Sequence, residues 1–168
     1  LAEKEYKIVS GYGLGIGSIV INGALDYKLN SNYRNLDDLL ILRPFPQMQS
    51  GTKSIPEIWT DYRNDMIVKA GIAIFVFGNK LVDGKIVNSN GMEEEFDICL
   101  KHSVVPIPIG STGSISKVLW EKVISNLTKY YPDNTDLHNA IKELGKENIS
   151  QDDIITDTIK AINILQKA

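Results

Sequence analysis

The hydrophobic and polar positions of this 168-residue chain form short apolar runs separated by longer stretches with helical periodicity. Glycine or proline bounds the apolar runs, which is typical of strands that end in turns. The clearest run, Gly71–Phe77, is continuous, as in strands that are covered on both faces of a sheet. The pattern predicts strands at Tyr6–Ser10, Leu39–Leu42, Gly71–Phe77 and Val104–Ile109.

Stretches of helical period lie between and after these strands. Pro56 suits the first turn of one helix, and Ser150 with Asp153 resembles a capping box at the start of the last. Asp133 or Asn134 can cap the helix before it. The predicted helices are Ser18–Asp26, Pro56–Lys69, Gly91–His102, Ser114–Tyr130, Thr135–Lys146 and Gln151–Gln166, with loops at Gln47–Ser54 and Gly78–Asn90 and a turn at Asp83-Gly84.

The elements therefore alternate between strand and helix and end in helices alone. This order predicts an α/β fold, a Rossmann-like parallel sheet with helices on both faces. Ligands on such sheets bind beyond the carboxyl ends of the strands. We expect the segments that follow the predicted strands to meet there: Ser10–Ser18, Arg43–Phe45, Phe77–Lys80 and Gly110–Gly113.

Composition narrows the class of protein. The length suits one domain over residues 1–168. The net charge is −3 without a basic block, so a nucleic-acid footprint is not expected. Cys99 is the only cysteine, which excludes an intramolecular disulfide, argues against a zinc site and fits a reducing cytoplasm. No apolar run is long enough to span a bilayer. The start at Leu1 leads us to expect a piece of a longer chain with a partner domain before it.

A glycine-rich turn directly after the first predicted strand is the main candidate for ligand binding. Glycine stands at positions 11, 13, 15 and 17, where it lets the backbone approach a ligand closely. The amides at the start of the following helix favour an anion. A tight turn without a ligand is the alternative, and the spacing is not the GxGxxG of dehydrogenases, so hydride transfer is not inferred.

Two basic side chains are placed near the same edge of the sheet. Arg63 flanks the apolar stripe of its predicted helix, and a guanidinium suits two oxygens of a diphosphate. Lys80 follows the buried strand Gly71–Phe77 directly. The alternatives are an arginine whose stem packs on the core and a solvated loop lysine. The stripe consists of Ile58, Trp59, Tyr62, Met66 and Ala70.

Glu95 is the acidic candidate. It flanks the apolar face of its helix formed by Met92, Phe96 and Cys99, whereas Glu94 points away from that face. A carboxylate at this place can accept hydrogen bonds from ribose hydroxyls. The alternative is an acidic first turn that complements the helix dipole. No spacing of histidine, cysteine or serine indicates a metal site or covalent catalysis.

Several stretches, in this order, resemble the SLOG domains of the NADase effectors of Thoeris, a bacterial anti-phage defence system. The resemblance covers the chain up to about Trp120. It implies a LOG/DprA-like fold that lies C-terminal to a sirtuin-like NAD-cleaving domain. The stretches are Ser10–Ser18, Leu42–Gln47, Tyr62–Ile67, Ile74–Lys80 and Glu94–Phe96.

The resemblance also implies a function. Such a domain binds a cyclic ADP-ribose isomer made by a TIR-domain partner, which allosterically activates the NADase, and the domains pair within a tetramer of the full-length protein. Arg63 and Lys80 would hold the diphosphate and Glu95 a ribose. The expected ligand-binding set is completed by Ser10, Gly11, Gly13, Leu14, Gly15, Arg43, Phe77, Gly78, Asn79 and Gly110.

Two rival interpretations remain open. The LOG branch of the superfamily consists of nucleotide phosphoribohydrolases with a Pro-Gly-Gly-x-Gly-Thr-x-x-Glu motif. The corresponding stretch here, Pro108–Lys117, has serine or lysine in place of the glutamate, which favours binding without cleavage because glycosidic hydrolysis usually needs carboxylates. Glu95 on another helix could act instead. The third interpretation is an assembly module without a ligand. We expect no catalytic residue, no metal and no cofactor beyond the nucleotide signal.

Overall fold

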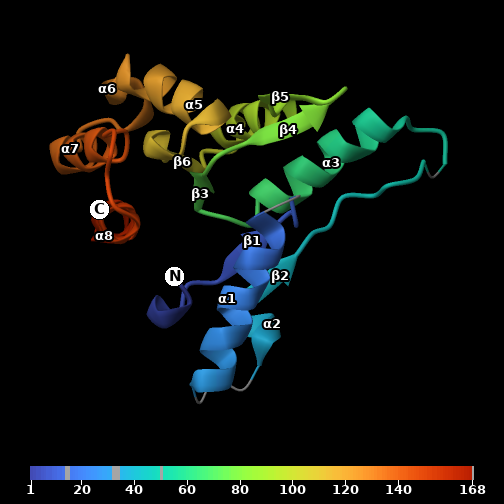
Figure 1. Cartoon of the computed structure of the whole chain (residues 1–168), viewed down its shortest axis with the longest axis horizontal. Helices are drawn as coiled ribbons and strands as arrows, with labels where there is room; N and C mark the ends of the chain where they lie inside the picture. Colours follow the sequence, from blue (N-terminus) through green and yellow to red (C-terminus); the bar gives the residue numbers. More distant parts are fainter. Residues whose placement is uncertain (14–15, 32–34, 50, 168) are drawn as a thin grey trace. The chain divides into compact units, whose positions relative to one another are not determined.

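The computed structural model describes residues 1–13, 16–31, 35–49 and 51–167 (Figure 1). The chain divides into two compact units, Leu1–Ala70 and Gly71–Ala168, and each is described by itself. Each unit contains a pair of parallel strands with helices beside it. The predicted α/β fold with parallel strands and flanking helices is thus confirmed, and a single domain over residues 1–168 stays a prediction.

The first unit is built on the parallel pair β1 (Ile8–Ser10) and β2 (Leu40–Leu42), with Ile8 opposite Leu40. A short 3-10 helix, η1 (Ala2–Lys4), precedes β1. Helix α1 (Ile16–Asn30) follows it, and one turn of helix, α2 (Leu36–Leu39), leads into β2. The core joins these elements because Ala24, Leu39 and Leu40 are buried together, with Ile8, Val20, Ile21 and Tyr27 packed around them.

Helix α3 (Ile55–Ile67) begins where the sequence places Pro56 in the first turn. Both the amide and the hydroxyl of Ser54 donate to Glu57 Oε2, at 2.8 and 2.7 Å. These bonds stabilise the carboxylate and lower the pKa of Glu57. The indole of Trp59 donates to the carbonyl of Pro46 at 2.7 Å. The helix is thereby tied to the loop that comes before it.

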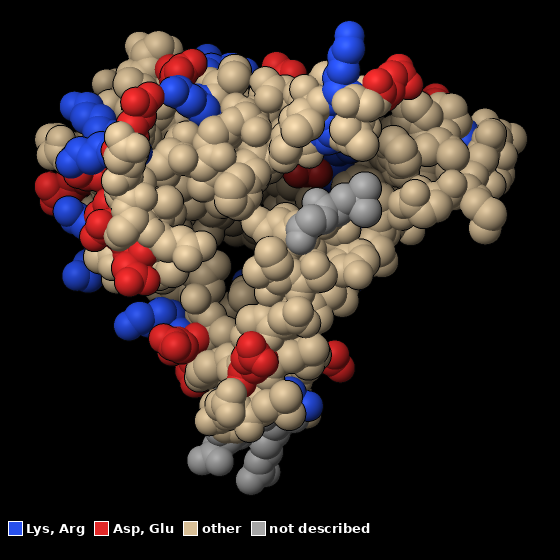
Figure 2. Space-filling model, in the orientation of Figure 1, with Lys and Arg blue, Asp and Glu red and all other residues tan. Residues whose placement is uncertain are grey.

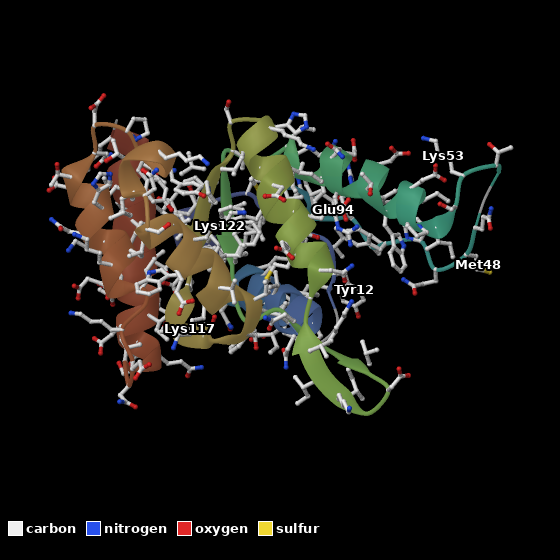
Figure 3. All side chains as sticks on the ribbon, turned by 90° about the horizontal axis from the view of Figure 1, so that it is seen from above. Tyr12, Met48, Lys53, Glu94, Lys117 and Lys122 are labelled. Atoms are coloured by element: carbon white, nitrogen blue, oxygen red, sulfur yellow. The ribbon has the colours of Figure 1, made fainter. Side chains whose placement is uncertain are left out.

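The second unit is built on the parallel pair β3 (Ile72–Phe75) and β6 (Val105–Pro108). Helices α4 (Asn90–Lys101) and α5 (Ser114–Ile124) contribute buried side chains, among them Phe96 and Leu119. Phe96 packs edge-on against Phe75, with ring centroids 5.6 Å apart. Lys122 of α5 lies over the ring of Phe96 (Figure 3), 5.0 Å from its centroid. The core includes Phe75, Phe96, Cys99, Ile107, Leu119 and Val123.

The outer edge of β6 carries two prolines. Val105 and Ile109 donate their amides towards β3, to the carbonyls of Gly71 and Phe75. Since amides alternate in direction along a strand, the residues between them, Pro106 and Pro108, stand where a donor would point away from β3. The hydroxyl of Tyr131 donates to the carbonyl of Pro106 at 2.6 Å. The prolines therefore cost the sheet no hydrogen bond.

The helices after β6 differ from the sequence-based prediction at one place. The predicted helix Ser114–Tyr130 is wrong as a single element, because α5 ends at Ile124 and a separate turn, α6 (Leu127–Tyr130), follows. The side chain of Asn126 accepts from the amide of Lys129 and so starts a new helix. Asn134 caps the next helix in the same way. That helix is α7 (Thr135–Glu143), and α8 (Gln151–Lys167) ends the described chain.

The prediction of a loop over Gly78–Asn90 is also wrong, because the middle of this segment forms a β-hairpin. Strand β4 (Asn79–Val82) pairs antiparallel with β5 (Lys85–Asn88). The turn at Asp83 and Gly84 is where the sequence predicts it, and both residues have positive φ angles, 49° and 75°, as a type I′ hairpin turn requires. The hairpin projects from its unit (Figure 3), and every residue of both strands is exposed.

Charged groups of both signs are interspersed on the surface (Figure 2), without a large area of one sign on the face shown. This matches the small net charge of −3. Among the described residues, no helix combines the length and the apolar character needed to cross a membrane.

Candidate functional site

The sequence-predicted ligand residues fall on both units. Most of them follow the parallel strands, whereas Arg63 lies within α3 and Glu95 within α4. Leu14 and Gly15 lie outside the described residues. That the two groups form one site stays a prediction. The first unit holds Ser10, Gly11, Gly13, Arg43 and Arg63, and the second holds Phe77, Gly78, Asn79, Lys80, Glu95 and Gly110.

In the first unit, Ser10 organises the start of the glycine turn. Its carbonyl accepts from the amide of Arg43 at 2.8 Å, which extends the pairing of β1 and β2 by one bond. Its hydroxyl accepts from the amide of Tyr12 at 3.2 Å. Tyr12 has a φ of 55°, a left-handed conformation that local side-chain bonds help to hold. The chain thus bends sharply at the carboxyl end of β1.

The side chains beside Gly11 explain why glycine stands at this position. A Cβ built on Gly11 would stand 2.9 Å from Cε2 of Phe45 and 3.1 Å from the sulfur of Met66. Phe45 in turn lies under a cation, because the Cζ of Arg63 is 5.1 Å from the centroid of its ring. The structure therefore brings Gly11 and Arg63 together around Phe45, an aromatic ring that the sequence analysis did not include among the ligand residues.

Arg63 lies on the buried side of α3. Its Nε is shielded from solvent, whereas Tyr62, expected in the buried stripe, is 39% exposed. Ile67, which the predicted stripe omits, is 5% exposed. The buried face of α3 is thus rotated towards Arg63 and Ile67, away from Tyr62. This places the guanidinium nearer the interior than a position at the edge of the stripe would.

Arg43 is held by a neighbouring carboxylate. Its Nε donates to Asp65 Oδ2 at 3.3 Å, and Lys69 donates to Asp65 Oδ1 at 2.6 Å. The hydrogen bond from Lys69, and then that from Arg43, lowers the pKa of Asp65. The positive charge of Arg43 is therefore partly neutralised within its own unit. Its position after β2 is as predicted, and a contact with a ligand stays a prediction.

In the second unit, Phe77 and Gly78 form a sharp corner after β3. Both have left-handed backbones, with φ of 56° and 85°. For a residue with a Cβ this conformation costs about 1–2 kcal/mol, so the surroundings must stabilise Phe77 in it. A Cβ on Gly78 would overlap the side chains of Ile115 and Met92. Only glycine fits here, on both conformational and steric grounds.

The corner leads directly into the hairpin that carries Asn79 and Lys80. Lys80 is exposed, and its ammonium group donates to the side-chain oxygen of Asn90, the first residue of α4. The ring of Phe77 is also exposed, at 52%. An aromatic face and an ammonium group thus follow β3 within a few residues of each other, and both remain accessible to solvent.

Glu95 is half-buried on α4, beside the core thiol Cys99. Burial, and secondarily the charge of Glu95, raises the pKa of Cys99 to about 12, so this thiol is not a nucleophile. The expectation that Glu94 points away is wrong, because Glu94 is half-buried as well (labelled in Figure 3). The reason is that Ile98, one turn after Glu94, is buried at 3% exposure and widens the apolar face.

The second glycine turn forms the 3-10 helix η2 (Gly110–Thr112). Three of its backbone amides donate to carbonyls of the same unit. The amide of Ser111 donates to Leu144, and those of Thr112 and Gly113 donate to Ile109 and Gly110. A Cβ on Gly110 would stand 2.7 Å from Trp120. Gly110 thus has a packing role, and its contact with a ligand stays a prediction.

Two hollows of the described surface lie elsewhere. One of about 360 Å³ is lined by Lys53 and the first turns of α3, and one of about 170 Å³ by Tyr130, Tyr131 and Leu165. Neither includes a sequence-predicted ligand residue. Within the described part of the chain, no group of three or more histidine, cysteine or acidic side chains is arranged to hold a metal ion.

Comparisons with known proteins identify relatives along almost the whole chain. The model of the Sir2- and TIR-associating SLOG family matches residues 1–165. A protein of Cytobacillus dafuensis named NAD(+) hydrolase ThsA is 45% identical over 166 residues, which are 99% of this chain and 34% of that protein. Proteins of the same name from Bacillus cereus (strain MSX-D12) and Enterococcus faecium are 41% and 39% identical, covering 98% and 99% of this chain and 34% of each relative. The chain thus spans about one third of the length of these relatives.

Proposed function

The chain belongs to the Sir2- and TIR-associating SLOG family, and from that premise we propose that it is a ligand-sensing domain which binds a cyclic ADP-ribose isomer. Binding would activate a sirtuin-like NADase region of the same polypeptide, in defence of a bacterium against phage. The family description supports the link to sirtuin-like and TIR proteins. The relatives' name, NAD(+) hydrolase, supports the link to NAD cleavage.

The observation that carries the proposal is the cluster of Gly11, Phe45 and Arg63. A guanidinium that lies 5.1 Å from an aromatic centroid is fixed in orientation, and its planar donors suit paired phosphate oxygens. Gly11 lets the backbone come close to the same place. In the second unit, Lys80 and Glu95 supply an ammonium group and a carboxylate, which suit the diphosphate and a ribose of such a nucleotide.

The same features favour binding over cleavage by this domain. In the second glycine turn, the amides that a phosphoribohydrolase would offer to a phosphate donate to protein carbonyls. Serine or lysine stands where that class of enzyme has glutamate. Cys99 is protonated and buried. We therefore propose that the bound nucleotide is recognised and released unchanged.

Isothermal titration calorimetry with a panel of cyclic ADP-ribose isomers, and linear ADP-ribose as the comparison, tests the proposal. We expect at least one cyclic isomer to bind, and Arg63→Ala to weaken that binding by about 1.5–3 kcal/mol, because a charge-assisted bond to phosphate is lost. Thermal unfolding checks that the variant is folded. If none of the isomers binds, the proposed ligand is wrong.

Lys80 offers a matched control on its own hairpin. Lys80→Ala should weaken binding as Arg63→Ala does, whereas Lys85→Ala, which removes an exposed lysine from the paired strand, should not. Glu95→Gln should weaken binding less, since an amide oxygen still accepts one ribose hydrogen bond. Equal effects at Lys80 and Lys85 would indicate a general charge effect in place of a site.

The enzymatic alternative is tested on the same protein. Incubation of the chain with AMP, with NAD and with the cyclic isomers, followed by chromatography, should return each nucleotide intact. Release of a free base or of nicotinamide by the domain would establish a glycosidase, and Glu95→Gln would then show whether that carboxylate takes part.

A further inference from the structure

The second glycine turn has a role that the sequence comparison with phosphoribohydrolases does not suggest. Thr112 of this turn contacts the segment Phe77–Lys80, the ligand loop, which follows β3. The hydroxyl of Thr112 accepts from the amide of Phe77 at 2.9 Å and donates to the carbonyl of Ile109 at 2.7 Å. One side chain thus bridges the loops that follow both strands of the parallel pair.

Ser116 completes the connection one turn further along. Its amide donates to the carbonyl of Phe77 at 3.0 Å. Its hydroxyl, fully buried, lies 2.7 Å from the carbonyl of Phe75 and 3.0 Å from that of Ile109. Both backbone polar groups of Phe77 are therefore bonded to the segment Thr112–Ser116. The amide of Ser89 also donates to the carbonyl of Gly78 at 2.8 Å.

We propose that Thr112 is a positioning residue for the ligand loop, in that its hydroxyl holds Phe77 in the left-handed conformation that directs Lys80 towards a bound diphosphate. The proposal rests on the proposed function for the identity of the ligand, but not for the conformational role. Phe77 carries the φ of 56° without the freedom of glycine, so this conformation lasts only while its neighbours stabilise it. The hydroxyl of Thr112 is the hydrogen-bond acceptor of the Phe77 amide.

The geometry separates Thr112 from its neighbour Ser111. The hydroxyl of Ser111 is buried and has no hydrogen-bond partner among the described residues. The two residues are adjacent, in the same short helix, and both carry a hydroxyl. Of the two hydroxyls, that of Thr112 accepts the hydrogen bond from the amide of Phe77. Ser111→Ala is therefore a matched control for loss of a hydroxyl from this turn.

Amide hydrogen exchange on the 168-residue chain, followed by NMR without ligand, tests the conformational role. Thr112→Val and Thr112→Ala should each speed exchange of the Phe77 amide at least about tenfold, because its acceptor is lost. Thr112→Ser should restore slow exchange, and Ser111→Ala should not change it. The amide of Val105, which donates to Gly71 at the other end of the strand pair, should stay protected in every variant.

Calorimetry on the same variants tests the consequence for binding. Thr112→Val should bind the cyclic isomer about tenfold more weakly than the wild type, and Thr112→Ser should bind within about twofold. Unchanged exchange at Phe77 in both hydroxyl-free variants, or faster exchange with unchanged affinity, overturns the proposal. If the wild type binds no isomer, the proposed function fails, and the exchange data alone decide whether Thr112 holds the loop.

Discussion

The two glycine-rich turns of this chain stand at similar places, each after a strand of a parallel pair, but they use glycine differently. At Gly11 the missing Cβ makes room for Phe45 and Met66, beside the guanidinium of Arg63. At Gly110 the missing Cβ makes room for Trp120. Both rings are half-buried, but that of Phe45 lies under the guanidinium of Arg63, whereas the indole of Trp120 donates to the carbonyl of Ile141 at 2.7 Å.

The backbone amides of the second turn already have acceptors inside the protein. In the second turn, the amides of Ser111, Thr112 and Gly113 all donate to carbonyls of the same unit. A glycine-rich turn can cradle an anion only while its amides have no other acceptor. Glycine content alone therefore does not identify a phosphate site, and the partners of the amides have to be known.

The largest expected effect comes from adding a methyl group to each turn. Gly110→Ala places a Cβ 2.7 Å from Trp120 and should lower the free energy of unfolding by about 1–3 kcal/mol through overpacking. For Gly13→Ala, no atom of the described residues lies within 4 Å of the new Cβ, and stability should change by less than about 0.5 kcal/mol. Urea denaturation measures both. Similar losses in the two variants would show that the space beside each glycine does not decide the cost of an added Cβ.

A smaller effect is expected from removing the ring that Arg63 lies over. Phe45→Leu should weaken binding of the cyclic isomer by about 0.5–2 kcal/mol, because the cation–π contact that orients the guanidinium is lost. Tyr62→Leu is the control, since its ring lies 6.4 Å from that of Phe45 and is 39% exposed. Calorimetry should show a weaker effect for Tyr62→Leu, and the reverse order would remove Phe45 from the site.

The smallest effect is electrostatic and confined to the first unit. Asp65 has its pKa lowered in the folded state, so its contribution to stability is present above the ordinary carboxyl value of 3.8 and is lost as the pH falls through the lowered folded value. Thermal unfolding of Asp65→Asn should therefore depend less steeply on pH below 3.8. Because the ion pairs are exposed, salt should reduce the difference from the wild type. An unchanged pH dependence would show that Arg43 and Lys69 do not stabilise the carboxylate.

The order of the strands and main helices was predicted from sequence periodicity. An element that buries one face repeats its apolar residues at a fixed period, and this repeat is visible in the sequence. The hairpin Asn79–Asn88 was missed although Asp83-Gly84 marks its turn. Both of its strands are exposed throughout, so no core selects an alternation of apolar and polar residues along them. The break at Asn126 was missed because a side-chain cap outweighs a helical pattern that continues across it.

For the candidate site, the sequence allowed prediction of the types of residue that take part and of the edge of the sheet where they lie. Arg63 followed from its place beside an apolar stripe, and the segment Arg43–Phe45 was expected at the same edge of the sheet. The contact of the Phe45 ring with Arg63 was not expected, since it joins residues distant in sequence through a loop without periodicity. Thr112 was overlooked for a different reason. In the comparison with phosphoribohydrolases, this turn is a phosphate-binding motif that has been partly lost. The role of the Thr112 hydroxyl is seen only in its hydrogen bond with the amide of Phe77.

The prolines of β6 matter when many copies of the domain are present at once. The outer edge of β6 is covered, because Pro106 and Pro108 are buried. If it became uncovered, a strand from another molecule would find proline rings in place of amide donors, and the carbonyl of Pro106 already occupied by Tyr131. Exposed strand edges are the usual starting points of aggregation, and proline is one of the residues that block them. This edge is therefore closed to strand addition, and the domain can be concentrated without its sheet growing on that side.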